Sequence, residues 1–218
     1  LLVLALAFVL LTGWLDGGIG VMPLRLLDQP RYPLANAWPG LLLAAILLAL
    51  TRRALLSFGL AFLLQGLLYG VNLLKAANLG TPLLPDDFRM VGQLRKGGMH
   101  LLAGYLPHSP WPYLGLLAAL ALFVAAWRLE PPIFAQRPRR PRLLAGGVLM
   151  AALLSMLLGL PAWGRIYNAK VLWLEPWWAS TTREHSGLIS SLMLFHLQYG
   201  RSQRAPDESA GAGDEDAA

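Results

Sequence analysis

The polar side chains whose types and spacing could bind a ligand or move a proton are concentrated between residues 65 and 89. Gln65, Tyr69 and Asn72 are spaced i, i+4 and i+7, so they share one face of a helix. Polar groups in an apolar helix usually face the interior of a bundle. This polar stripe either lines a cavity for a lipid headgroup or forms hydrogen bonds between helices, which is the commoner role and the one we favour. Beside it, Gly66 and Gly70 predict the close approach of another helix.

A second candidate site follows at the end of the same helix. Lys75 lies on the side of the polar stripe, and Asp86 and Asp87 come after a segment with two prolines. Because proline restricts the chain, we expect the segment to fold back and bring a carboxylate near Lys75. The resulting pocket would hold an anionic phospholipid headgroup through Lys75, with Arg89 as a second cation. The candidate substrate-binding residues are therefore Asn72, Lys75, Asp86, Asp87 and Arg89.

Simpler roles for the same residues stay open. The ammonium of Lys75 could extend to the membrane surface without binding a ligand. The acidic pair could bind a divalent cation or work as acid and base, but such pairs more often stabilise the N-terminus of a helix.

No other set of residues predicts a catalytic or metal centre. The four histidines are scattered, none of them at the spacing of metal ligands, and the chain contains no cysteine. Thr181 and Thr182 lack a base or metal that would activate a nucleophile. Instead, Thr181-x-x-Glu184 predicts a capping box at the start of a helix. We assign no catalytic residue, no metal ligand and no cofactor to this chain.

The elements that must position these residues are apolar. Of 218 residues, 56% are hydrophobic and 14% are charged, against roughly 45–50% and about 25% in soluble domains. This composition excludes a disordered chain, a nucleic-acid-binding tail and most water-soluble folds. The net charge of +6 is typical of a membrane protein that collects arginine in its cytoplasmic loops. The sequence opens at Leu1, inside an apolar run, so we expect a fragment whose true start is missing.

Five stretches approach the about 20 apolar residues that a membrane-spanning helix needs. They are residues 1–15, 34–50, 54–74, 111–127 and 143–163, of which the first is truncated. A cleaved signal peptide is the alternative for the first stretch, but no basic segment or cleavage site supports it. We therefore predict an all-α membrane protein with a five-helix transmembrane bundle in residues 1–163.

The distribution of basic residues predicts the topology. Seven of the 18 Lys and Arg residues lie in the two short connections 52–53 and 128–142. Short loops rich in Lys and Arg stay in the cytoplasm. The N-terminus is then inside, and the chain after Trp163 is outside.

Two external segments are amphipathic. Residues 86–106 and 181–199 place apolar side chains at helical spacing, with polar residues mostly opposite. We expect both to lie as interfacial helices on the outer membrane surface, the second within a juxtamembrane region 164–200. Residues 201–218 lack apolar periodicity and predict a polar linker or disordered tail.

Three short patterns carry a resemblance to a known family. They are Asn72-x-x-Lys75, Leu79-Gly80-x-Pro82-Leu83-x-x-x-Asp87 and Ser186-Gly187-Leu188. Between residues 59 and 199 the chain resembles the N-terminal membrane domain of lipoteichoic acid synthase-like proteins, the sulfatase-fold phosphoglycerol transferases. Many relatives have asparagine where this chain has Ser186.

The resemblance implies a bacterial cytoplasmic-membrane protein with an extracytoplasmic catalytic domain beyond Ala218. That domain would use a threonine nucleophile and a divalent metal, manganese, to transfer a glycerophosphate headgroup from a phospholipid to a glycan or glycolipid. This chain would anchor it, contact membrane lipids and present an anionic phospholipid donor, with no nucleic acid as partner. The alternatives are a non-enzymatic anchor or assembly subunit, and a small transporter.

Overall fold

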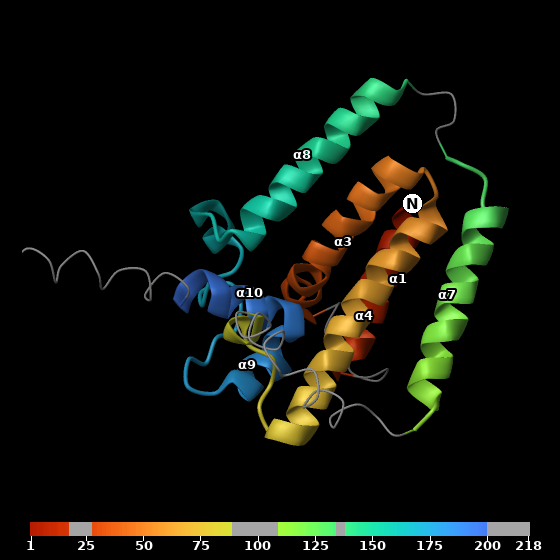
Figure 1. Ribbon diagram of the computed structural model, residues 1–218. Coiled ribbons are helices and arrows are strands. Elements are labelled where there is room, and N and C mark those ends of the chain that lie inside the picture. Colours follow the sequence, from red (N-terminus) through yellow and green to blue (C-terminus); the bar gives the residue numbers. More distant parts are fainter. Residues whose placement is uncertain (18–27, 89–108, 134–137, 200–218) are drawn as a thin grey trace, which may run out of the picture.

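In the computed structural model, residues 1–17, 28–88, 109–133 and 138–199 are described, and within these ranges the chain is helical without a strand (Figure 1). The all-α prediction is confirmed for this part of the chain. The elements are α1 (Leu2–Gly17), α3 (Arg31–Thr51), α4 (Ala54–Leu79), α7 (Trp111–Leu129), α8 (Arg139–Leu157), the 3-10 helix η2 (Pro161–Arg165), α9 (Ala179–Ser186) and α10 (Leu188–Tyr199).

Three of these helices, α3, α4 and α8, are long and apolar enough to cross a membrane. The helices α1 and α7 occupy the positions of the first and fourth predicted spans, but their apolar stretches are shorter. The predicted end of the fifth span at residue 163 is wrong. Helix α8 ends at Leu157, because Gly159 turns the chain with a φ of +73° and Pro161 then starts η2.

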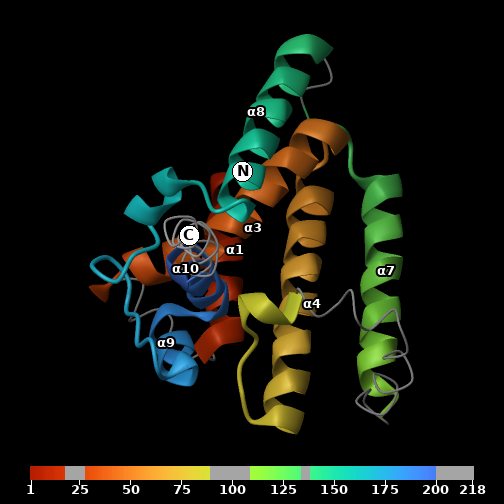
Figure 2. The same cartoon turned by 60° about the vertical axis from the view of Figure 1, so that its left-hand side comes forward.

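The centre of the bundle is formed by α1, α3 and α4. Three alanines with no exposed surface, Ala37, Ala44 and Ala61, lie in this core. A β-carbon on Gly40 would lie 2.5 Å from Cζ of Phe8, so this glycine brings α3 close to its neighbours. The prediction that Gly66 and Gly70 mediate close packing is wrong for the described residues, since no atom of another described segment lies within 4 Å of the place of either β-carbon. Helix α7 packs beside α4, away from α8 (Figures 1 and 2).

The two arginine-rich connections meet at one end of the bundle. The carboxylate of Glu130 accepts hydrogen bonds from the backbone N–H groups of Leu55 (2.9 Å) and Leu56 (3.0 Å), at the start of α4. The N–H of Ile133 donates to the carbonyl of Arg52 at 2.6 Å. These contacts join the α3–α4 turn to the chain that follows α7. The predicted topology places both connections on the cytoplasmic side, so they are expected to lie at the same end of the bundle.

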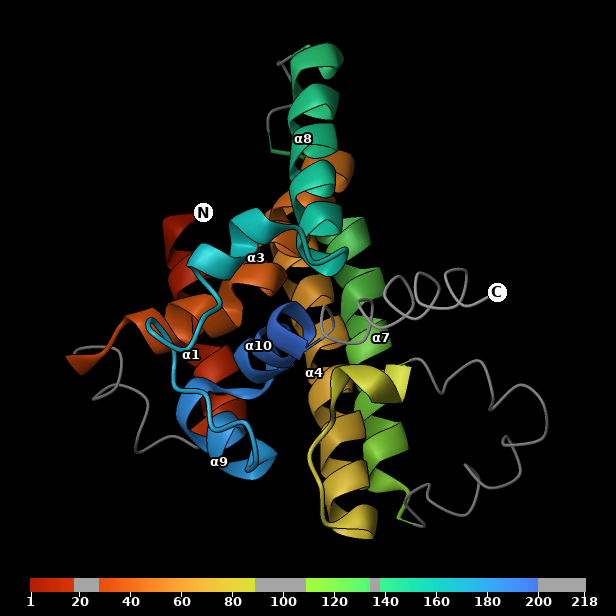
Figure 3. The ribbon, with the colours of Figure 1, turned by 90° about the vertical axis from the view of Figure 1, so that its left-hand side faces the viewer.

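Helices α9 and α10 lie at the opposite end and pack against α3, and the N-terminus of α10 meets the end of α1 (Figure 3). The prediction of a single helix over 181–199 is wrong, because the chain breaks at Gly187 between two helices. The predicted capping box is also wrong. Helix α9 begins at Ala179 after the N-cap residue Trp178, so Thr181 lies within the first turn and not at the cap position.

Helix α10 is enclosed by protein rather than half exposed. Residues 188–198 are all buried or half-buried. Its apolar side chains contact two clusters, one with Tyr69 and Leu83, the other with Met156 and Tyr167. Burial raises the pKa of the Tyr167 phenol, whose hydroxyl donates to the carbonyl of Ala35 at 2.8 Å. This bond ties the segment between α8 and α9 to α3, and Tyr167 packs in the same apolar cluster as Leu194 of α10.

Candidate functional site

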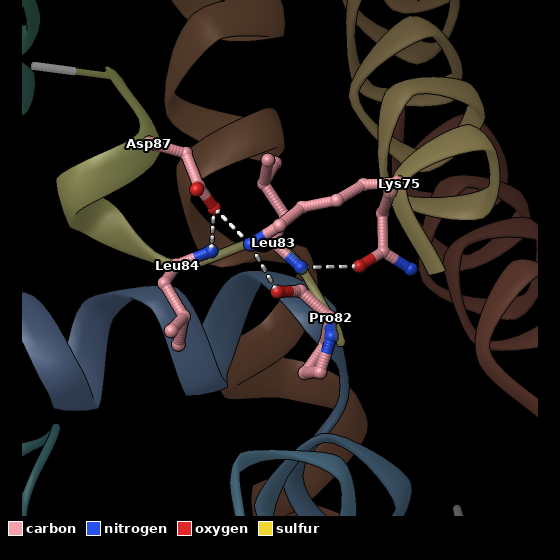
Figure 4. A network of polar contacts seen from close by, with 6 residues as sticks. Lys75, Pro82, Leu83, Leu84 and Asp87 are labelled. Carbon is pink, nitrogen blue, oxygen red and sulfur yellow. Dashed lines mark hydrogen bonds and ion pairs between the residues drawn. The ribbon is translucent and has the colours of Figure 1, made fainter. Parts of the chain in front are cut away.

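The segment after α4 folds back along the helix, as predicted (Figure 4). Gly80 ends α4 with a φ of +68°. The ammonium of Lys75 donates to the carboxylate of Asp87 at 2.6 Å and to the carbonyl of Pro82 at 2.9 Å. The side-chain oxygen of Asn72 accepts the N–H of Leu83 at 2.8 Å. We call these five residues, Asn72, Lys75, Pro82, Leu83 and Asp87, the loop latch.

Asp87 also stabilises the start of a helical turn over residues 85–88. Its carboxylate accepts the N–H of Leu84 at 2.6 Å, and its own N–H donates to the carbonyl of Leu84 at 3.1 Å. The carboxylate contact is the half of a capping box in which the third helical residue accepts the N–H of the N-cap residue, so a capping role is confirmed for Asp87. Asp86 is exposed on the same turn. Arg89 and the rest of the predicted helix 86–106 lie outside the described residues.

The geometry of the loop latch favours a structural role over the binding of a ligand. The side chains of Lys75 and Asp87 are 14% and 28% exposed, so their ion pair is partly shielded from water. Two of the three ammonium donors of Lys75 bind protein oxygens, and the adjacent carboxylate balances its charge. Lys75 therefore has less charge to offer an anionic headgroup than a free lysine at the membrane surface.

We expect Lys75→Met to loosen the loop latch. The substitution keeps the apolar stem but leaves Asp87 without its cation, at an estimated cost of about 1–2 kcal/mol for a partly buried pair. Thermal unfolding in detergent should occur at lower temperature, and proteases should cut residues 80–88 faster. Lys170→Met removes a charge from an exposed position and is the matched control. Equal stability of the two variants would show that the ion pair contributes nothing.

The polar stripe makes hydrogen bonds between elements, which confirms the favoured interpretation. The amide of Gln65 donates to the hydroxyl of Thr12 in α1 at 2.8 Å. The hydroxyl of Tyr69 accepts from Asn36 in α3 at 2.9 Å, and Asn72 holds the loop latch. Each side chain thus ties α4 to a different segment. The Oε1 atom of Gln65 is buried without a hydrogen-bond partner among the described residues.

A second polar centre holds the N-terminus of α10. The side-chain oxygen of Asn36 accepts the N–H groups of Ile189 (2.8 Å) and Ser190 (3.0 Å). One carboxylate oxygen of Asp16, in α1, accepts the N–H of Leu188 at 3.0 Å. The first N–H groups of a helix have no partner within it. Here two other helices supply the acceptors for three of them.

The same centre connects the acceptors to one another and to α4. The amide nitrogen of Asn36, a residue that is only 2% exposed, donates to Tyr69 and to the second carboxylate oxygen of Asp16. Gly187, which precedes α10 and has a φ of +86°, lies against the side chains of Asn36 and Asp16. We call these four residues, Asp16, Asn36, Tyr69 and Gly187, the docking centre. It joins α1, α3 and α4 to α10.

Tyr69 and the Ser186-Gly187-Leu188 pattern were recognisable from the sequence, but Asp16 and Asn36 were not predicted. A signal was present, because Asp16 is the only charged residue among the first 17 and polar residues in apolar stretches mark interior contacts. Ser186, where many relatives have asparagine, is buried and donates to the carbonyl of Trp173 at 2.6 Å.

Among the described residues, no three His, Asp or Glu side chains form a group that could hold a metal ion. Comparison with known proteins adds no assignment: no family model, curated protein or solved structure matches the chain. The resemblance to lipoteichoic acid synthase-like membrane domains therefore stays a prediction from three short patterns.

Proposed function

We propose that this chain is the membrane domain of an extracytoplasmic, sulfatase-like phosphoglycerol transferase of the bacterial cytoplasmic membrane. It anchors the catalytic domain and presents the phospholipid donor. The observation that carries the proposal is the docking of α10 into the bundle at the end opposite the arginine-rich connections. Simple tethering of a domain would not need such docking.

The docking centre gives α10 a defined position. Its first turn is bound by side chains of α1 and α3, and the rest of the helix is enclosed by apolar residues. The chain that follows Tyr199 therefore starts from a fixed point of the bundle. A catalytic domain attached there would be held above the membrane surface at the level of the loop latch.

The charge distribution supports the orientation in this proposal. Six described arginines lie in or beside the two connections at the other end, namely Arg52, Arg53, Arg128, Arg139, Arg140 and Arg142. Lys and Arg favour the cytoplasmic side in short loops. That end then faces the cytoplasm, and the loop latch and α10 face outward.

The chemistry belongs to the catalytic domain, which would supply the threonine nucleophile and the divalent metal. The described residues of this chain offer no group that fits such a metal, so we assign no chemical step to them. Their contribution is to hold the turn 85–88 and α10 together at the outer surface, where an anionic phospholipid would be presented.

The proposal predicts that the complete protein transfers labelled glycerophosphate from a phospholipid in the presence of manganese. This chain alone should transfer none. A phosphatase reporter that matures only outside the cytoplasm should be active when fused after Arg204. A complete protein without transfer activity would favour the anchor or assembly subunit, and an inactive reporter would overturn the orientation.

A further inference from the structure

An apolar groove of about 620 Å³ opens on the side of the bundle. Helices α3, α4 and α8 contribute Leu43, Leu64 and Met156, α10 contributes Leu192, and the turn 85–88 contributes Pro85 and Phe88. We call this the side groove. Its polar lining residues are Gln65 and His196, and the Nε2 atom of His196 is already hydrogen-bonded to the carbonyl of Leu157 at 2.8 Å.

We propose that the side groove binds one acyl chain of a membrane phospholipid. Three of its walls are the helices that are long and apolar enough to cross a membrane. The medium around those helices is then hydrocarbon, and acyl chains are the apolar ligand present there in excess. The proposal rests on the membrane location in the proposed function but not on transferase activity.

The size and lining of the side groove favour a ligand over an empty space. Protein interiors are close-packed, with few voids larger than a water molecule, whereas ligand sites measure roughly 300–1,000 Å³. Water is a poor occupant, because it needs several polar partners and the lining is mostly leucine, methionine and proline. A flexible methylene chain can follow such a surface, and it would leave Oε1 of Gln65 as it is, buried without a hydrogen-bond partner among the described residues.

The position of the side groove sets the direction of the lipid. Pro85 and Phe88 lie on the turn that the loop latch holds, toward the C-terminal end of α4. Leu64 lies near the middle of that helix. An acyl chain in the groove would therefore run along α4, with its ester end beside the turn 85–88. The headgroup would then lie on the loop-latch side of the bundle.

A photoreactive phospholipid tests this proposal in the protein reconstituted in lipid nanodiscs. The probe carries a diazirine in one acyl chain, and labelled peptides are mapped by mass spectrometry. We expect labelling of groove residues such as Leu64 and Met193 to exceed labelling of exposed Leu117 and Leu122 on α7. Phosphatidylglycerol and phosphatidylcholine probes with the same chains should label equally, because the groove contacts the chain.

Leu64→Trp should fill the side groove and lower groove labelling by about tenfold, equivalent to about 1.4 kcal/mol of binding free energy. Leu67→Trp is the matched control, because Leu64 and Leu67 are 46% and 47% exposed on the same helix and only Leu64 lines the groove. Leu43→Trp fills the groove from α3 and should have the same effect. Agreement between the two variants would show that misfolding of one of them is not the cause of the lower labelling.

Three outcomes would overturn the proposal. The first is groove labelling no higher than that of α7, as expected if another segment of the chain covers the groove. The second is equal labelling in wild type, Leu64→Trp and Leu67→Trp. The third is labelling by phosphatidylglycerol alone, because the headgroup would then determine binding. A failure of transferase activity or of the predicted orientation would leave all these measurements unchanged, so the two proposals fail separately.

Discussion

Gly187→Ala is expected to release α10 from the bundle. At a φ of +86° and a ψ of 162°, the backbone occupies a region that is essentially reserved for glycine. A β-carbon there would lie 2.6 Å from Cγ of Asn36 and 2.7 Å from the carboxylate of Asp16. Backbone strain together with displacement of two buried polar side chains should cost roughly 2–4 kcal/mol.

The release can be measured by thiol labelling, because the chain contains no cysteine of its own. Ser190→Cys places a thiol in the first turn of α10, where the serine has no exposed surface and its hydroxyl has no hydrogen-bond partner within the described part of the chain. A maleimide should react slowly in this background and much faster after Gly187→Ala is added. Gly164→Ala is the control, because its β-carbon position has no other described segment within 4 Å. Equal reaction rates would mean that Gly187 is not needed for docking.

Composition and local patterns were sufficient to predict the helices of the bundle. Apolar runs located α1, α3, α4, α7 and α8 to within six residues at either end, because a helix apolar enough to cross a membrane appears in the sequence as such a run. The fold-back of residues 80–87 was also predictable. Lys75 and Asp87 are only 12 residues apart, and the prolines between them leave the chain few alternatives.

Contacts between distant segments were not predictable in this way. The bond between Asp16 and the N–H of Leu188 joins residues 172 positions apart, and Asn36 meets Ile189 across 153. The apolar stripe of α10 suggested a membrane surface, but such a stripe cannot tell lipid from protein as its partner. Likewise Gly66 and Gly70 in α4 have the spacing of a packing motif, but the close contact with neighbouring helices is made at Gly40 in α3. Spacing along one helix does not determine which face a neighbour covers.

Asn36→Leu tests whether the docking centre holds α10 through hydrogen bonds. Leucine has nearly the same size, but it removes the one oxygen that accepts the Ile189 and Ser190 N–H groups and the amide nitrogen that donates to Asp16 and Tyr69.

Because these groups are buried, their loss should cost roughly 3–5 kcal/mol. Tyr69→Phe removes only one of the four bonds that Asn36 makes and should cost about 1 kcal/mol. Unfolding in detergent, followed by the thiol at Ser190→Cys, compares the two variants. If Asn36→Leu is no less stable than Tyr69→Phe, apolar contacts alone hold α10. The polar centre would then not be what fixes the point from which the rest of the chain leaves the bundle.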